Sequence, residues 1–188
     1  TSAERTAPVV GLTIVDLCTG SGAVAIALAR ELPGARLFAT DSSWRALRVA
    51  RANAAAHGVS DRVVVLRGDL WRAFAPAHAG AAPVDVVVAN PPYIPSGTIG
   101  ALMPEVQWEP KVALDGGADG LRVLREIILT TPAHLRAGGS LLLEIGEDQA
   151  GAVAQLFEAT GHFESPRILQ DLAGRDRVVV ARRRGNEQ

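Results

Sequence analysis

Short, continuously apolar runs alternate along this chain with longer segments in which apolar residues recur at helical spacing. Continuous apolar runs are typical of parallel strands that are buried on both faces, and the helical segments fit the crossovers between such strands. This alternation predicts an α/β fold, a three-layer sandwich with a mostly parallel sheet at its centre. The expected strands are residues 12–17, 36–39, 62–66, 84–89, 140–145, one near 162–169, and 177–181.

Capping and stop residues indicate where the helices begin and end. A serine before an apolar segment caps a helix, and a following glycine or proline ends one. The expected helices are 23–32; a segment from a cap at Ser42 or Ser43 to His57; a segment through Leu121, Leu124, Ile127 and Ile128 that is kinked near Pro132; and 149–160. A chain of 188 residues fits one domain, which we place at 12–184, between an N-terminal arm or truncated linker at 1–11 and a tail at 185–188.

Composition and charge exclude several classes of protein. The chain is 48% hydrophobic and 21% charged, with a formal net charge of -1, so no strong field draws the whole molecule to nucleic acid or to a membrane. No apolar stretch has transmembrane length. The single cysteine, Cys18, rules out an internal disulfide and fits a reducing compartment, so we expect a cytoplasmic protein. The four histidines (His57, His78, His134 and His162) are scattered, so we expect no metal site.

A glycine-rich loop follows the first expected strand. Gly20 and Gly22 let the backbone pass close to a ligand. The third glycine of the dinucleotide-binding fingerprint is absent, because Ala25 occupies its position. The loop also opens with an acid, which is unhelpful beside a pyrophosphate and useful near a cationic ligand. We therefore expect ligand binding by Asp16, Cys18, Thr19, Gly20, Ser21 and Gly22.

Acidic residues also follow the next two strands. Asp41 can accept hydrogen bonds from both ribose hydroxyls of an adenosine, although a nicotinamide cofactor would use the same acid and a helix cap is the structural alternative. Asp69 could meet the adenine amino group while Leu70 packs on the ring. For Asp69, a solvated turn is the alternative. These residues indicate a nucleoside without identifying the cofactor.

The motif Asn90-Pro91-Pro92-Tyr93 comes directly after the apolar run 84–89. A residue before proline is forced into an extended conformation, and proline itself has no N–H, so the backbone carbonyls here are free to accept hydrogen bonds. The Asn90 amide offers one acceptor and two donors, which suits a planar NH2 group beside a carbonyl or ring nitrogen. Tyr93 is the only tyrosine and could stack on a flat substrate. We expect all four residues to bind substrate, with Asn90, Pro91 and Tyr93 catalytic.

Together these strand ends resemble the layout of Rossmann-like class I methyltransferases that use S-adenosylmethionine (SAM), whose seventh strand is antiparallel and would be 177–181 here. The flanking blocks resemble the bacterial release-factor glutamine methyltransferases, the PrmC/HemK family, from about residue 12 to 182. These blocks are Ile94-Pro95, Pro104-Glu105-Val106, Glu109-Pro110, Ala113-Leu114, Gly116-Gly117, Asp119-Gly120-Leu121 and 171–179.

That resemblance implies N5-methylation of the glutamine in the Gly-Gly-Gln loop of peptide chain release factors. SAM is then the donor, S-adenosylhomocysteine is the product, and no metal takes part. The resemblance also implies SAM contacts at residues 18–22, Asp41, Leu70 and Asn90, with residues 90–93 holding the glutamine. The expected partners are release factors.

Two departures from the family keep alternatives open. Most relatives have glycine where Cys18 stands, and bacterial relatives carry a preceding small helical domain that we expect to be missing here, so a SAM-binding module with little activity is one alternative. A second is an N6-adenine methyltransferase of nucleic acid, because the Asn-Pro-Pro-Tyr motif suits both kinds of NH2 group. Such an enzyme would want a basic stripe, and the dense basic run is residues 182–184. A nicotinamide-dependent oxidoreductase is a third.

Overall fold

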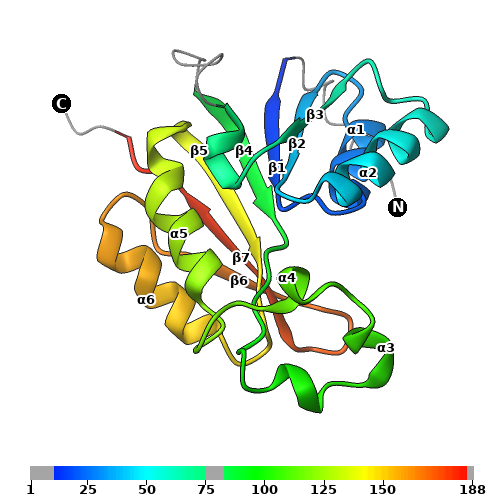
Figure 1. Cartoon of the computed structure of the whole chain (residues 1–188). Helices are drawn as coiled ribbons and strands as arrows, with labels where there is room; N and C mark the ends of the chain where they lie inside the picture. Colours follow the sequence, from blue (N-terminus) through cyan, green and yellow to red (C-terminus); the bar gives the residue numbers. More distant parts are fainter. Residues whose placement is uncertain (1–10, 75–82, 186–188) are drawn as a thin grey trace. The chain divides into compact units, whose positions relative to one another are not determined.

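The computed structural model describes residues 11–74 and 83–185, so most of the expected arm, His78 and the last three residues of the tail lie outside it. The strands form a seven-stranded sheet in the order β3-β2-β1-β4-β5-β7-β6 (Figure 1). The expected α/β fold with one antiparallel strand near the C-terminus is confirmed. The chain divides into two compact units, residues 1–86 and 87–188, and whether 12–184 behaves as one domain stays a prediction.

The first unit is built from parallel strands joined by helices. β1 pairs in parallel with β2, and β2 pairs in parallel with β3, so that Leu17 lies opposite Thr40 and Asp41 lies opposite Arg67. In-register parallel pairing brings the carboxyl ends of the three strands to one edge. The elements are β1 (Thr13–Leu17), α1 (Ala23–Glu31), β2 (Arg36–Asp41), α2 (Trp44–Ala56), β3 (Val63–Arg67) and the 3-10 helix η1 (Leu70–Phe74).

The core of the first unit is made largely of small residues. Ala25 and Ala29 of α1 are fully buried in one cluster with Leu37 and Ala39 of β2. Alanine methyl groups let a helix approach a strand closely, and each buried aliphatic group adds to the hydrophobic stabilisation of the fold. This packing fixes α1 against β2, and α1 begins directly after Gly22 of the glycine-rich loop. β4 (Val84–Ala89) begins in this unit and ends in the next.

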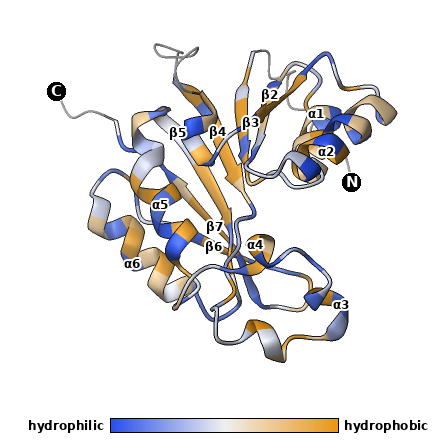
Figure 2. Cartoon of the chain, viewed as in Figure 1, coloured by the Kyte–Doolittle hydropathy of each residue, from blue (hydrophilic) through white to orange (hydrophobic). Residues whose placement is uncertain are grey.

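The second unit holds the antiparallel strand and the longer loops. β7 runs antiparallel to both β5 and β6. The face of α5 that carries Val123, Leu124, Ile127 and Ile128 is buried, as its helical spacing predicts. Figure 2 shows β4 and β5 as largely hydrophobic. The remaining elements are η2 (Ile99–Ala101), α3 (Pro104–Gln107), α4 (Lys111–Leu114), α5 (Arg122–Thr130), η3 (Thr131–Ala133), β5 (Leu135–Glu144), α6 (Ala150–Thr160), β6 (Arg167–Gln170) and β7 (Asp176–Arg182).

Several expected boundaries were wrong. β5 begins at Leu135, before the glycine pair that was expected to precede the strand. The reason is that Arg183 continues the backbone pairing past the glycines, accepting from Gly138 N at 2.9 Å and donating to Gly139 O at 2.8 Å. β6 is shorter than expected, because Phe163 forms only an isolated bridge with Arg183. Among the described residues, no helix is both long and apolar enough to cross a membrane.

Cys18 has a left-handed backbone, with a φ of 59°. Such a conformation costs an L-residue about 1–2 kcal/mol, and a β-branched residue more. We therefore expect Cys18→Gly to preserve or raise the free energy of unfolding, and Cys18→Val to lower it, as measured by urea denaturation. The same pair of substitutions at Ser42, which is exposed and has no positive φ, should show the opposite order. A valine variant at residue 18 as stable as the glycine variant would contradict this explanation.

Candidate functional site

A buried carboxylate opens the glycine-rich loop of the first unit. Asp16 lies near the end of β1 and is only 1% exposed. It accepts hydrogen bonds from Thr19 Oγ1 at 2.6 Å and from the backbone N of Ala25, in the first turn of α1, at 3.2 Å. Burial raises the pKa of Asp16 to about 6; the two hydrogen bonds oppose that rise, and the nearby charge of Asp41 adds to it.

A second carboxylate holds the loop from the end of β2. Asp41 accepts from Gly20 N at 2.9 Å through one oxygen and from Ser43 N at 2.8 Å through the other. Ser43 caps α2, because its hydroxyl accepts from Ala46 N at 3.3 Å. Asp41 therefore links the glycine-rich loop to the start of α2. The sequence left open that Asp41 itself caps this helix, but the capping residue is Ser43.

The rest of the loop is fixed by contacts with its neighbours. Thr19 N donates to Thr40 O at 2.9 Å, and Asn53 of α2 donates to Ser21 O at 2.9 Å. Gly22 is the residue that precedes α1. A Cβ at Gly20 would meet no atom of the chain within 4 Å, so the loop borders open space at this point. The structure thus brings the expected residues 16–22 together with Asp41.

The end of β3 joins the same group. Gly68 N donates to Asp41 O at 3.1 Å, which places the expected pair Asp69 and Leu70 next to the end of β2. Leu70 is buried and has a φ of 47°. Asp69 is exposed and forms an ion pair with Arg72 at 2.8 Å. This edge of the first unit therefore carries three acids, of which Asp69 is paired with Arg72, and the charges of Asp16 and Asp41 suit a cationic ligand.

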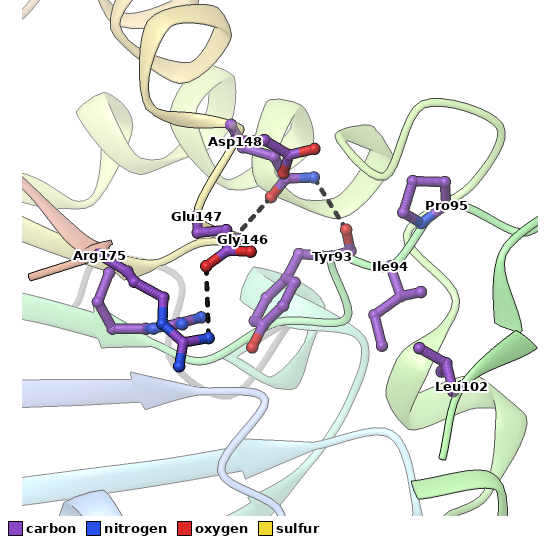
Figure 3. A pocket seen from close by; sticks show the side chains of 10 residues that line it. Tyr93, Ile94, Pro95, Leu102, Gly146, Glu147, Asp148 and Arg175 are labelled. Atoms are coloured by element: carbon purple, nitrogen blue, oxygen red, sulfur yellow. Dashed lines mark hydrogen bonds and ion pairs between the residues drawn. The ribbon is translucent and has the colours of Figure 1, made fainter. Parts of the chain in front are cut away.

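The motif Asn90-Pro91-Pro92-Tyr93 lies in the second unit, directly after β4. Asn90 is exposed, Pro91 is buried, and Pro92 and Tyr93 are half-buried. The Tyr93 hydroxyl donates to Glu144 Oε1 at 3.3 Å. The Tyr93 carbonyl accepts from Gln149 Nε2 at 2.9 Å, and Figure 3 marks this bond with a dashed line. The motif is therefore held at its far end, by Tyr93, while Asn90 at its start is exposed.

Charged groups surround the Tyr93 phenol. Burial raises the pKa of Tyr93, the negative charge of Glu144 raises it further, and the positive charge of Arg177 acts in the opposite direction. The Arg177 guanidinium donates to Ile145 O at 3.2 Å and to Asp171 Oδ2 at 3.4 Å. The phenol is consequently a neutral hydrogen-bond donor at physiological pH.

A cleft of about 320 Å³ opens beside Tyr93. Its apolar wall includes Ile94, Pro95 and Leu102. Its polar wall includes Glu147 and Arg175, which form an ion pair at 3.4 Å (Figure 3). A cleft that combines an apolar wall with opposite charges suits a segment of polypeptide.

Sequence reasoning missed three residues that support this motif: Glu144, Gln149 and Arg177. Glu144 could have been found, since it follows a leucine run at the end of a strand, as Asp16 follows its own apolar run. Gln149 and Arg177 carry no such signal, because each was assigned only to an element of secondary structure. Within residues 11–74 and 83–185 there is no group of three acidic, histidine or cysteine side chains that could hold a metal ion, and metal-free chemistry stays a prediction.

Asp16 should make the fold less stable at neutral pH. Its folded pKa of about 6 lies above the pKa of 3.8 that is usual for an aspartate in an unfolded chain. Each pKa unit corresponds to about 1.4 kcal/mol, so the charged form destabilises the fold by about 3 kcal/mol at pH 7, and this penalty disappears below pH 4. We expect Asp16→Asn to be more stable than wild type at pH 7.5, with the difference shrinking at pH 4.5, in urea denaturation.

The exposed Asp61 provides the control, because Asp61→Asn should change stability little at either pH. A stability difference between Asp16→Asn and wild type that is independent of pH would contradict the raised pKa.

Because Tyr93 is the only tyrosine, its ionisation can be followed alone by absorbance near 295 nm. We expect a pKa above 10, since burial and Glu144 both oppose the phenolate. Glu144→Gln should lower that pKa, whereas Glu147→Gln, which removes a neighbouring acid paired with Arg175, should leave it unchanged. Equal titrations for wild type and Glu144→Gln would show that the phenol does not face this carboxylate.

Comparison with known proteins bears on both units. Residues 5–103 match the family described as the methyltransferase small domain. The chain is 48% identical over 171 residues to the release factor glutamine methyltransferase of Gloeobacter violaceus, which covers 90% of this chain and 58% of the relative. It is 46% identical over 181 residues to the enzyme of the same name from Moorella thermoacetica, covering 96% of this chain and 62% of the relative. The chain therefore spans about three fifths of the length of these curated relatives, and the resemblance read from the motifs is confirmed.

Among solved structures, a methyltransferase from Pyrococcus furiosus matches with a TM-score of 0.68 and 15% identity, over 96% of this chain and 79% of that one. This likeness concerns the fold, which is that of Rossmann-like class I methyltransferases. Because the family match covers more than half of the chain, the chain belongs to the methyltransferase small domain family.

Proposed function

We propose that this chain is the catalytic part of a protein glutamine N5-methyltransferase that transfers a methyl group from SAM to the glutamine of the Gly-Gly-Gln motif of peptide chain release factors. The observation that carries the proposal is the exposed Asn90 amide at the head of Asn-Pro-Pro-Tyr, in a chain whose curated relatives are named release factor glutamine methyltransferase. Release factors act in translation, which supports a cytoplasmic location.

We assign binding of the methyl donor to the first unit. SAM supplies a methyl group on a positively charged sulfur, and the fold and the family both imply its use. The charges of Asp16 and Asp41 favour a cation, and the open space at Gly20 allows close approach of a ligand to the backbone. Asp41 keeps further acceptor capacity for ribose hydroxyls, because each carboxylate oxygen accepts more than one hydrogen bond. Asp69 and Leu70 are assigned to the adenine.

We assign binding of the acceptor to residues 90–93. An amide nitrogen is a poor nucleophile, because its lone pair is delocalised into the carbonyl, and positive charge builds on it as the new C–N bond forms. The side-chain oxygen of Asn90 and the Pro91 carbonyl accept from the two N–H bonds, which stabilises that charge and aims the lone pair at the methyl carbon. As the N–C bond forms, the S–C bond breaks, and one proton then leaves the nitrogen for water.

The segment after the acceptor motif has the character of a partner-binding surface. It exposes three large apolar side chains, with Met103 69%, Trp108 88% and Val112 67% exposed. Glu105, Glu109 and Lys111 lie among them. Aromatic residues and methionine are enriched in protein interfaces. We infer that this segment contacts the release factor.

Methylation of adenine in nucleic acid is the second candidate, because the same motif suits its NH2 group. The structure offers it little support. The arginines of the basic run 182–184 donate to carbonyl oxygens of their own unit: Arg182 to Gly138 at 3.1 Å, Arg183 to Leu135, and Arg184 to Phe163 at 2.7 Å. Guanidinium groups that hold the backbone in this way are less available to phosphates.

The test is transfer of label from radioactive SAM to an intact release factor or to duplex DNA. We expect the release factor to be labelled, and we expect Asn90→Ala to lower the rate by about 10²–10³-fold, the scale for losing one preorganised polar partner. SAM affinity, measured by calorimetry, should change much less, because the other residues expected to bind SAM lie in the first unit.

Asn90→Asp is the matched chemical control, since it keeps an acceptor oxygen and loses both donors; we expect a rate between those of wild type and Asn90→Ala. Label on DNA alone would overturn the substrate, tight SAM binding without turnover would favour a binding module, and a wild-type rate in Asn90→Ala would remove Asn90 from the mechanism.

A further inference from the structure

The acceptor motif, residues 90–93, to which we assign the methyl acceptor, lacks two of the backbone N–H groups that usually fix a loop. Pro91 and Pro92 have no N–H, so this stretch cannot be held by the donor groups that anchor ordinary loops. It must be held instead through the groups that flank it. Tyr93 provides two such groups, its carbonyl and its hydroxyl, and the carbonyl belongs to the backbone of the motif itself.

Gln149 binds that carbonyl. Its side chain comes from a residue 56 positions further along the chain, directly before α6, and is only 7% exposed. Its Nε2 donates to Tyr93 O at 2.9 Å, and its Oε1 accepts from Gly146 N at 2.9 Å (Figure 3). The side chain makes no capping hydrogen bond to α6, so both ends of the amide serve to join the turn after β5 to the acceptor motif.

Gly120 closes the space beside this hydrogen bond. A Cβ at Gly120 would lie 2.4 Å from Tyr93 O and 2.6 Å from Gln149 Nε2. Its φ of 74° also favours glycine. The Gly120 backbone therefore packs against both the carbonyl and the amide, and leaving either of these groups unpaired would be costly. The Gln149 side chain is thus a specific partner for this carbonyl.

We propose that Gln149 is a positioning residue for methyl transfer, which fixes the backbone of residues 90–93 by holding the Tyr93 carbonyl to the turn at Gly146. This inference rests on the proposed function. It assigns to Gln149 no contact with the substrate. Gln149 acts instead by fixing the direction in which Asn90 and the Pro91 carbonyl point. A misplacement of about 1 Å at a reacting centre can lower a rate by about 10²-fold.

The first test compares Gln149→Ala with Gln155→Ala, which changes an exposed glutamine within α6. We expect Gln149→Ala to lower kcat by up to about 10²-fold, with smaller changes in KM for the release factor and in SAM affinity. Gln155→Ala should behave as wild type. Since Tyr93 is the only tyrosine, protein made with carbonyl-13C tyrosine has one labelled carbonyl. Its NMR resonance should move in Gln149→Ala and stay in place in Gln155→Ala.

The second test uses Gln149→Glu at several pH values. When protonated, the introduced carboxyl group can donate to Tyr93 O and accept from Gly146 N, as the amide does; when ionised, it cannot donate. Burial should raise the pKa of this group. We therefore expect the ratio of its kcat to that of wild type to rise as the pH falls, with the Tyr93 carbonyl resonance returning toward its wild-type position. If Gln149 only stabilised the fold, kcat per folded molecule would equal that of wild type at every pH.

The outcomes separate this inference from the proposed function. A lowered kcat, a moved resonance and rescue at low pH support it. An unmoved resonance, or a moved resonance with wild-type kcat, overturns it. If wild type does not methylate release factors while the resonance still depends on Gln149, the proposed function fails although the structural link holds.

Discussion

Two adjacent prolines, Pro91 and Pro92, follow β4 closely and remove two hydrogen-bond donors from the backbone, and a few residues of the second unit hold the chain directly after them. The Tyr93 carbonyl is held by Gln149 and its hydroxyl by Glu144. Ile94, one residue later, is paired on both sides, donating to Leu114 O at 3.0 Å and accepting from Gly116 N at 2.8 Å. A stretch whose two prolines cannot donate is thus fixed by the residues that follow them.

In the first unit the backbone N–H groups are present, and side-chain carboxylates bind them. Asp16 and Asp41 bind the backbone N–H groups of the loop and of the helix starts, and these carboxylates keep spare acceptor capacity. Burying Asp16 raises its pKa, so the charged form opposes folding at neutral pH. A destabilising charge at a strand end is typical of functional sites, where pKa values are most often perturbed. The same negative charge supports the assignment of a cationic methyl donor to this unit.

Much of the fold could be predicted because its signals are local. Apolar runs and capping residues located β1, β2, β4 and α2 to within two residues, and Ser43 was one of two expected caps. The start of β5 was missed, because the pairing of Gly138 and Gly139 depends on Arg183, far away in the chain. The short helices in residues 99–114 were missed as well, since segments of three or four residues carry too little periodicity to detect.

The sequence alone determined the alternation of the longer strands and helices, the glycine-rich loop, the acids at the strand ends and the motif at 90–93, whose two prolines have no backbone N–H. All of these depend on the chemistry of neighbouring residues. The tertiary structure decided which distant side chains serve that motif. Gln149 and Glu144 reach Tyr93 across 56 and 51 positions, and Gly120 leaves room for that contact only because two separate loops pack together. Hydrogen bonds of this kind are set by packing, and no local pattern in the chain records them.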